Sequence, residues 1–568
     1  MKKSCKDVPC DVLIVGSGAG GLSTAITARK NGLDVLVIEK EPYFGGTTAF
    51  SGGVLWVPGN HHAKRRGLKD TPKAARTYLQ NEAGNFFRDE AVAAFLDNGP
   101  RMLEFFERET AVKFLPTDYP DYHPTVEGGV EIGRSVVAAP YDIRNLGSDI
   151  ARLRPPLETI TFIGMMFNSS NNELKHFFNV TKSLTSALYV GKRLARHIVE
   201  LARYRRGVQV TSGNALVARL AKSALDLGIP IRTETAARDL WVENGQVKGM
   251  FVEGPDGDVR IAARRGVVLA CGGFPQDRLR VSKLYPHAAK GQAHNSPTPS
   301  GNTGDGIRMA EQVGAGFEGQ YPNAAAWMPV SKVPLGGGRI GLFPHLVDRY
   351  KPGVIAVTRH GRRFVNEANS YHDVGAAMIQ VCEDEAETAA WLICDHATIR
   401  KYGLGYVKPA PVPLRSFIAS GYLTKGDSLS ALAAAAGIDP AGLNATVDAF
   451  NRGAEHGTDP EFGRGTTAFN RYLGDPGHAP NPNVGPIRKG PFYAVKLVMG
   501  DLGTFDGLTT DTVGRVLGQD AEPIPGLYAV GNDRASIMGG NYPGAGITLG
   551  PIMTFGFITG RHLAGVPA

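Results

Sequence analysis

A glycine-rich turn between two apolar runs constrains the fold of this chain more than any other feature. Residues 12–15 form an apolar run typical of a buried parallel strand, and the spacing GxGxxG follows at residues 16–21. A helical pattern comes next, and a second apolar run at residues 33–38 ends on Glu39. Strand, turn, helix and strand in this order predict a complete βαβ unit in an α/β fold.

Each part of this unit has a physical task that points to a dinucleotide ligand. Gly16 permits the tight turn, Gly18 lets the backbone approach a pyrophosphate, and Gly21 lets helix and strand pack closely. The helix N-terminus offers free N–H groups and the positive end of its dipole to the phosphates. Glu39 stands where a carboxylate accepts hydrogen bonds from a ribose diol. We therefore expect dinucleotide binding; the alternative is a plain glycine turn in an ordinary α/β core.

Composition is that of a soluble globular protein and argues against several other classes. The chain has 568 residues and a formal net charge of +8, but no nucleic-acid-binding module accompanies that charge. Its five cysteines include no CxxC pair, so we expect reduced thiols, a cytoplasmic protein and no metal site. Asp7 and Asp11 interrupt the start of the chain, so no signal peptide is expected, and no apolar stretch reaches the length of a spanning helix.

A second glycine-rich segment, residues 44–53, follows the βαβ unit. Its paired glycines and small hydroxyl residues suit a loop that lies against a flavin. Together with the GxGxxG unit, this loop resembles the FAD-binding half of the fumarate reductase/succinate dehydrogenase flavoprotein superfamily. The resemblance implies a Rossmann-like FAD-binding domain with an inserted α+β substrate domain. Some relatives attach FAD through a histidine where Gly46 stands, so we expect non-covalent FAD.

Later segments are expected to return to the same cofactor, so that its site is assembled from residues far apart in sequence. We place the FAD-binding domain at residues 1–289 and 489–568 and the substrate domain at residues 290–488. The residues expected to bind FAD are Gly16, Gly18, Ala19, Gly20, Gly21, Glu39, Lys40, Gly46, Thr47, Thr48, Ser51, Gly52, Gly53, Gly273, Asp305, Asn532, Gly546 and Leu549.

Three tyrosine-bearing segments narrow the resemblance. They are the loop at 118–124 with Tyr119 and Tyr122, Tyr371 after the GxRFxNE motif, and the segment Tyr542-Pro-Gly-Ala-Gly546. Together they resemble the 3-ketosteroid Δ1-dehydrogenases, and the resemblance covers nearly the whole chain outside residues 155–206. It implies FAD-dependent 1,2-desaturation of a 3-ketosteroid, with an external electron acceptor such as a quinone.

The resemblance also implies a role for each of these residues. The Tyr542 hydroxyl and the Gly546 N–H hold the C3 carbonyl and stabilise the enolate-like charge that develops there. Tyr371 removes the C2 proton as a phenolate, and the C1 hydrogen leaves as hydride to flavin N5. A free tyrosine has a pKa near 10, so Tyr371 needs a hydrogen bond from Tyr119 or Tyr122. The sequence leaves open which of the two provides it.

Three other functions fit the sequence less well. A fumarate-reductase-like reduction needs arginines and histidines that clamp two carboxylates; Arg349 and Arg363 are present, but the expected His-Pro-Thr segment is not recognisable. A 3-ketosteroid Δ4-(5α)-dehydrogenase is nearer, but it lacks the Tyr-Pro-Gly-x-Gly pattern. A non-catalytic escort protein that reuses the fold is disfavoured by the intact glycine turn and Glu39.

Residues 155–206 form an unusual insert. An apolar run at 157–167 is too short to span a bilayer, and apolar residues then recur at near-helical spacing from Phe177. Eight basic residues and one acidic residue lie between positions 174 and 206. This pattern predicts a basic amphipathic helix that associates with the inner face of the cell membrane, or equally a solvated hairpin or an oligomer contact.

Overall fold

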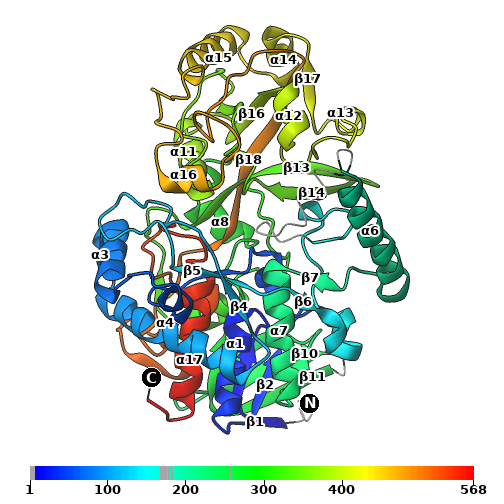
Figure 1. Ribbon diagram of the computed structural model, residues 1–568. Helices are drawn as coiled ribbons and strands as arrows, with labels where there is room; N and C mark the ends of the chain where they lie inside the picture. The colour runs from blue at the N-terminus through cyan, green and yellow to red at the C-terminus, as the bar shows by residue number, and fades with distance from the viewer. Residues whose placement is uncertain (1–6, 167–175, 177–179, 181–182, 256, 568) are drawn as a thin grey trace.

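The computed structural model describes residues 7–166, 176, 180, 183–255 and 257–567. Two sheets organise the described chain, one in the lower half of Figure 1 and one in the upper half. The lower half contains both the first and the last segments of the chain, and the upper half contains the middle. The Rossmann-like fold with an inserted second unit, expected from the sequence, is therefore confirmed.

The lower, eight-stranded sheet is built around β1 (Asp7–Val15). Parallel pairs join β21, β11, β1, β2 and β8 in that order, and β20 pairs antiparallel at one edge. A predicted hairpin, β9 with β10, extends the sheet from β11. The bounds of these strands are Val35–Ile38 (β2), Ile231–Arg232 (β8), Ala236–Glu243 (β9), Gln246–Gly254 (β10), Gly257–Leu269 (β11), Arg515–Leu517 (β20) and Pro523–Ala529 (β21).

Three helices cover one face of this sheet and share one hydrophobic core: α1 (Ala19–Lys30), α7 (Ser212–Asp226) and α17 (Leu549–Leu563). The first and last of these pack closely, because a Cβ at Gly560 of α17 would lie 2.7 Å from the Cβ of Thr27 in α1. The predicted βαβ unit is confirmed, with α1 between the parallel strands β1 and β2. The final helix thus meets the first one beside the glycine turn.

The upper, six-stranded sheet is antiparallel, in the order β14-β13-β18-β16-β15 with β17 paired to β18. Strand β18 (Phe492–Thr504) is central to it, so the chain contributes to the upper sheet beyond the expected boundary at residue 488. The exact domain limits remain predictions. The other strands are Ala325–Gly336 (β13), Arg339–Pro344 (β14), Val354–Val357 (β15), Ala389–Asp395 (β16) and Thr424–Gly426 (β17).

The junction between the two halves is formed by shorter elements. A three-stranded sheet, β3 (Val54–Trp56), β5 (Ser135–Ala138) and β4 (Phe114–Pro116), lies near the helices α3 (Pro72–Ala83) and α4 (Asp89–Glu109). Helix α11 (Tyr371–Val381) begins at a tyrosine, and the Ser370 side chain caps it by accepting from the Asp373 amide at 3.1 Å. The insert contributes α6 (Leu184–Tyr204), on the right of Figure 1.

Further helices complete the two halves. Their bounds are His61–Arg65 (α2), Arg278–Leu284 (α8), Pro286–Ala289 (α9), Asp305–Glu311 (α10), His396–Tyr402 (α12), Arg415–Ala419 (α13), Leu429–Ala436 (α14), Pro440–Ala454 (α15) and Ala468–Tyr472 (α16).

Candidate functional site

The glycine turn after β1 leaves no room for side chains. Gly16 has φ of +110°, and a Cβ there would overlap the carbonyl oxygen of Ala270, which follows β11. A Cβ at Gly21 would overlap the carbonyl oxygen of Gly16 itself. Gly18, in contrast, would meet only the Thr48 hydroxyl at 3.7 Å. The first and third glycines therefore serve packing, and Gly18 presents bare backbone at the mouth of the turn.

Glu39 is fixed at the end of β2 by hydrogen bonds to the glycine turn. Its Oε2 accepts from the Ser17 hydroxyl at 2.6 Å and from the Ser17 amide at 3.2 Å, and its Oε1 accepts from the Glu41 amide at 3.1 Å. The sequence did not single out Ser17. These bonds leave further acceptor capacity on a carboxylate held in one orientation, which suits recognition of a diol.

A cavity of about 860 Å³ follows this turn. It is lined by eleven of the residues expected from the sequence: Gly16, Gly18, Ala19, Gly20, Glu39, Lys40, Gly46, Thr47, Thr48, Asp305 and Asn532. Sequence reasoning missed other lining residues, among them Ser17, Glu41, Arg154, Thr235, Ala237, Cys271, Gly301 and Asn302. Asn302 and Gly301 lie in the same glycine-rich segment as Asp305, so the sequence contained a signal for these two lining residues. No sequence motif marks Arg154 or Thr235.

The remaining expected cofactor residues lie outside that lining: Gly21, Ser51, Gly52, Gly53, Gly273, Gly546 and Leu549. Two of them have a packing role instead. A Cβ at Gly53 would overlap the backbone of Ser212, at the start of α7. The Gly273 amide donates to Asp533 Oδ1 at 2.9 Å, and the Cys271 amide donates to Oδ2 at 2.6 Å. Buried Asp533 thus shapes the turn after β11.

Polar contacts tie the segments around the cavity together. Lys40 Nζ donates to Asp305 Oδ2 at 2.5 Å, and the Asn302 side chain donates to the Thr47 hydroxyl at 2.7 Å. Burial alone would raise the pKa of Asp305, but its hydrogen bonds and charge contacts with Lys40 and Arg308 outweigh this and lower it. The cavity therefore combines backbone N–H groups, hydroxyls and fixed charges from segments far apart in the sequence, a donor set that fits FAD.

A cluster of three tyrosines lies beside this cradle. The rings of Tyr122 and Tyr542 stack with centroids 5.6 Å apart and 15° between their planes. The Tyr371 ring meets them edge-on, 5.9 Å from Tyr122 and 5.0 Å from Tyr542, and its hydroxyl lies close enough to both for them to raise its pKa. All three side chains are less than a tenth exposed. Segments from three distant parts of the sequence thus converge on one point.

Tyr119, the other tyrosine of the 118–124 loop, lies outside the cluster. Its ring packs against Tyr472, 4.6 Å between centroids. The loop is fixed so that Tyr122 points inward: the Tyr122 amide donates to the Pro543 carbonyl at 2.8 Å, and Asp121 accepts from Trp56 Nε1, also at 2.8 Å. Of the two tyrosines in this loop, Tyr122 is thus the one whose ring contacts Tyr371.

Gly546 adopts a conformation that only glycine takes without strain. Its φ is +93°, and a Cβ would lie 2.5 Å from the Val54 carbonyl oxygen. The Gly546 carbonyl accepts from the Trp56 amide at 3.0 Å, and its own amide donates to no acceptor among the described residues. This N–H lies four residues after Tyr542, whose side chain is buried.

The cluster is apolar enough to keep its hydroxyls protonated. Burial raises the pKa of Tyr371 and of Tyr122 well above the usual value, and it also raises the pKa of Tyr542. His372, whose ring lies 6.0 Å from Tyr542, has a pKa lowered by burial to about 4. Its Nδ1 accepts from the Trp327 amide at 3.1 Å, so it is neutral and already engaged at neutral pH.

The GxRFxNE motif supports the tyrosines rather than facing them. Arg363 pairs with Glu367 at 2.7 Å and with Asp459 at 2.8 Å, and Arg464 pairs with the same glutamate at 3.1 Å; all four are buried. Arg349 donates to the Glu367 carbonyl at 2.6 Å. Neither Arg349 nor Arg363 is arranged to clamp a dicarboxylate, because both hold the segment that leads to Tyr371.

A second, smaller cavity of about 370 Å³ adjoins the cradle and shares Gly531, Asn532 and Ile552 with it. Phe505 and Thr548 also line it, and both contact Tyr542. Arg534 lines its wall; burial lowers the pKa of this arginine to about 9, and its Nε and Nη1 atoms have no hydrogen-bond partner among the described residues. This is a buried cation without a carboxylate partner.

The sequence predicts neither a metal site nor a membrane-spanning helix, and the structure bears on both. His61, His62 and Glu107 place three potential metal ligands within 4.8 Å of one another. Both histidines bond to the same Glu107 oxygen, at 2.7 and 3.0 Å, so a hydrogen-bonded triad accounts for their geometry. In the described part of the chain, no helix combines the length and apolarity needed to cross a bilayer.

A dinucleotide cradle assembled from segments far apart in the sequence, beside a buried tyrosine cluster, defines an FAD-dependent oxidoreductase. The chain belongs to the family described as FAD binding domain, which matches residues 11–549. It is 43% identical to a 4-oxocyclohex-2-ene-1-carboxylate 5-dehydrogenase of Sinomonas cyclohexanicum, over 99% of this chain and 95% of the relative. It is 38% identical to a 3-oxosteroid 1-dehydrogenase of Mycobacterium tuberculosis (strain ATCC 25618 / H37Rv), over 98% of each.

A solved structure agrees with these relatives. The 3-ketosteroid Δ1-dehydrogenase from Sterolibacterium denitrificans, in complex with 1,4-androstadiene-3,17-dione, matches this fold with a TM-score of 0.89 at 35% identity. The match covers 98% of this chain and 99% of that one. The expected cofactor, FAD, and the expected class of enzyme are thereby confirmed.

Proposed function

We propose that this protein introduces a 1,2 double bond into cyclic ketones of the 3-ketosteroid type. One observation carries the proposal: Tyr371 contacts both Tyr122 and Tyr542 in one buried cluster, and the Gly546 amide, four residues after Tyr542, donates to no acceptor among the described residues. This set offers one group to accept a proton and two to hold a carbonyl oxygen. The likeness to a 3-oxosteroid 1-dehydrogenase and to the structure that contains a 1,4-diene-3-one supports it.

In this proposal, the Tyr542 hydroxyl and the Gly546 N–H donate to the C3 carbonyl of the substrate and stabilise the negative charge that builds on its oxygen. Tyr371, ionised to its phenolate, accepts the C2 proton, and the Tyr122 hydroxyl stabilises that phenolate before the transfer. FAD held in the cradle without a covalent link at Gly46 would supply the acceptor for the C1 hydrogen, which leaves as hydride. An external acceptor such as a quinone then receives the two electrons.

Burial of the cluster sets a condition on this chemistry. The raised pKa of Tyr542 keeps its hydroxyl protonated, as a carbonyl donor requires. Burial raises the pKa of Tyr371, and its contacts with Tyr122 and Tyr542 raise it further, which opposes its role as a base; the Tyr122 hydroxyl must therefore donate to the phenolate when it forms. The cluster also excludes water, which strengthens each of these hydrogen bonds.

A smaller, anionic ketone is a second candidate substrate. It is favoured by the relative named for a 4-oxocyclohexene carboxylate and by the guanidinium of Arg534 in the cavity that adjoins the cradle; this buried group lies over the Phe555 ring and has no carboxylate partner among the described residues. In such a substrate, a six-membered ring ketone would meet Tyr542 and Gly546 as a steroid A ring does. The carboxylate would require a cation, which a steroid does not.

Anaerobic flavin bleaching distinguishes these functions. Androst-4-ene-3,17-dione should bleach the purified enzyme and yield the 1,4-diene; 4-oxocyclohexanecarboxylate bleaching the enzyme in its place would favour the second candidate. With 5α-androstane-3,17-dione, a 1-ene product supports the proposal, whereas a 4-ene product would identify a Δ4-(5α)-dehydrogenase. Fumarate turnover with a reduced dye and no bleaching by any ketone would overturn the proposal.

A further inference from the structure

The helix α6 turns its polar side to the protein and its apolar side to solvent. Of the four buried residues of α6, Ser186, His197 and Glu200 are polar and Val190 is apolar; His197 and Glu200 are 2% and 5% exposed. Leu184, Leu188 and Ile198 are 78%, 67% and 66% exposed. Together with the exposed residues Ala195 and Val199, these three residues follow helical spacing along one side, which we call the outer stripe. This orientation is the reverse of that of an ordinary surface helix.

Hydrogen bonds fix this rotation of the helix. The Glu200 carboxylate accepts from the Val208 amide at 3.2 Å, and His197 Nε2 donates to the Ile163 carbonyl at 2.7 Å. Ile163 itself is 66% exposed and enlarges the apolar surface next to the helix. Turning the stripe inward would break both hydrogen bonds and bring apolar side chains to the positions that the buried polar groups now occupy. The stripe therefore faces solvent for as long as the helix is docked.

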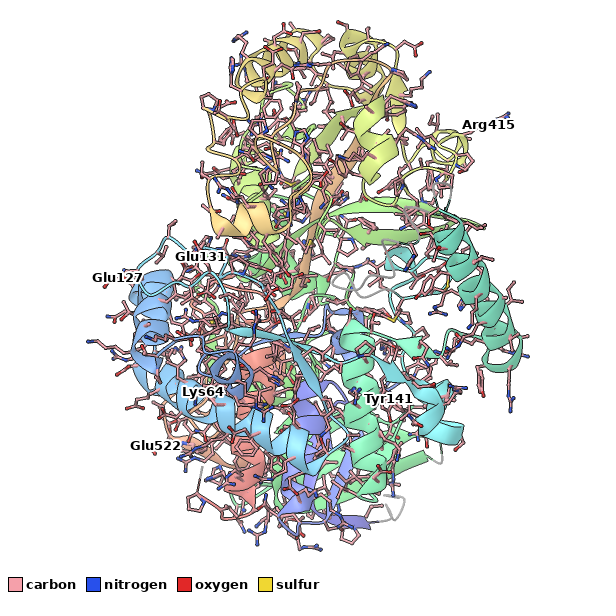
Figure 2. All side chains as sticks on the ribbon, viewed as in Figure 1. Lys64, Glu127, Glu131, Tyr141, Arg415 and Glu522 are labelled. Atoms are coloured by element: carbon pink, nitrogen blue, oxygen red, sulfur yellow. The ribbon has the colours of Figure 1, made fainter. Side chains whose placement is uncertain are left out.

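Basic residues border the outer stripe. At 100° per residue, Lys192, Arg196 and Arg203 lie together along one side of it. The one acidic residue of α6, Glu200, is buried and pairs with Arg196 at 2.9 Å. Figure 2 shows the side chains of α6 projecting away from the body of the protein at its right edge. The surface thus combines exposed apolar side chains with a border of positive charge.

We propose that α6 lies on the surface of an anionic lipid bilayer, with the outer stripe in the acyl region and the basic border at the headgroups. Insertion of apolar side chains and electrostatic attraction to anionic lipids are the two contributions that bind such a helix to a bilayer surface. A second copy of this chain is a poorer occupant, because α6 presents no exposed acidic residue to meet the bases of its partner. This inference is independent of the substrate proposed above.

Vesicle co-sedimentation of the FAD-loaded enzyme tests the proposal. Vesicles of phosphatidylcholine and phosphatidylglycerol should bind the enzyme at low salt, and vesicles of phosphatidylcholine alone should bind it less. The double variant Leu188→Gln/Ile198→Gln should lose about tenfold or more in partitioning. Lys192→Gln/Arg203→Gln should lose roughly tenfold at low salt and little at high salt. Leu279→Gln, which alters a leucine 76% exposed on α8, is the matched control.

The flavin spectrum and turnover of each variant should equal those of the parent enzyme, because α6 contributes no residue to the cradle or the tyrosine cluster. No binding to anionic vesicles at low salt, or an equal loss in the Leu279→Gln control, would overturn the proposal. So would a lipid-free dimer that the Leu188→Gln/Ile198→Gln variant dissociates, since the stripe would then be a subunit interface.

Discussion

His123 Nε2 lies 3.0 Å from Asp373 Oδ2, and this contact joins the two segments that carry Tyr122 and Tyr371. His123 follows Tyr122 directly, and Asp373 lies two residues after Tyr371 on α11. The other ring nitrogen, Nδ1, is 2.9 Å from Glu82 of α3. One imidazole therefore links the loop, α3 and the helix of the upper half that begins at Tyr371. We regard it as the contact that sets the spacing of the two tyrosines.

The His123 bridge should stabilise the protein below neutral pH. Burial alone would lower the pKa of His123, but the hydrogen bonds and charges of Asp373 and Glu82 raise it to about 10. The unfolded chain has the lower pKa, near 6.5. The stabilisation is thus complete below pH ~6.5 and is lost as the pH rises through ~10.

Replacing His123 tests this pH dependence. His123→Gln should cost on the order of 2 kcal/mol in the free energy of unfolding at pH 6, and much less at pH 10, by urea unfolding. His360→Gln, which alters a largely exposed histidine paired with Glu385, should cost little at either pH. A cost for His123→Gln that is the same at both pH values would show that the bridge is not charged.

Tyr371→Phe should lower 1,2-desaturation about 10³-fold while FAD stays bound, because the ring remains and only the proton acceptor is lost. The measurement is turnover with androst-4-ene-3,17-dione, alongside the visible spectrum of the flavin. Near-normal turnover would remove Tyr371 from the role of base.

Tyr122→Phe and Tyr119→Phe form a matched pair in one loop. Tyr122→Phe should lower kcat about 10- to 100-fold, because the Tyr371 phenolate would lose the hydrogen bond that the Tyr122 hydroxyl donates in the proposed mechanism. Tyr119→Phe should change kcat less than about threefold, since the Tyr119 ring packs against Tyr472 outside the cluster. The reverse ranking would assign the supporting role to Tyr119.

The sequence predicted the cradle well because local rules govern it. A glycine turn between a buried strand and a helix has few backbone solutions, so Gly16, Gly18 and Glu39 could be assigned from spacing alone. The cradle residues that lie far from the glycine turn in sequence could not be predicted in this way. Arg154 and Thr235 reach the cavity through strand pairing and loop packing, and no spacing in the chain marks them.

The tyrosine site was only half predictable for a similar reason. Motif context pointed to Tyr371 and Tyr542, but the choice between Tyr119 and Tyr122 depends on contacts with residues more than 400 positions away, such as Pro543. The sequence also could not show that the outer stripe of α6 faces solvent. Periodicity reveals that a helix is amphipathic, but which side faces the protein depends on partners such as Val208 and Ile163.

Gly16→Ala should abolish FAD retention, and Gly32→Ala should not. Both glycines have positive φ and lie in the same βαβ unit, so both substitutions strain the backbone by about 1 kcal/mol. Only at Gly16 would the new Cβ overlap another residue, the Ala270 carbonyl; nothing lies within 4 Å of the position at Gly32. The ratio of flavin to protein absorbance after purification gives the measurement, and equal loss in both variants would mean that strain, rather than the close approach, decides binding.

Turnover should rise with pH across the neutral range. Burial raises the pKa of Tyr371 well above 10, so the phenolate is a small fraction of the free enzyme and grows about tenfold per pH unit. Burial raises the pKa of Tyr542 as well, which keeps the carbonyl donor protonated and predicts no falling limb below pH ~10. The expected profile of log kcat/KM therefore climbs with a slope near one between pH ~7 and ~9. In Tyr371→Phe the residual rate should lose this slope, and a flat profile in the parent enzyme would contradict proton abstraction by a buried tyrosine.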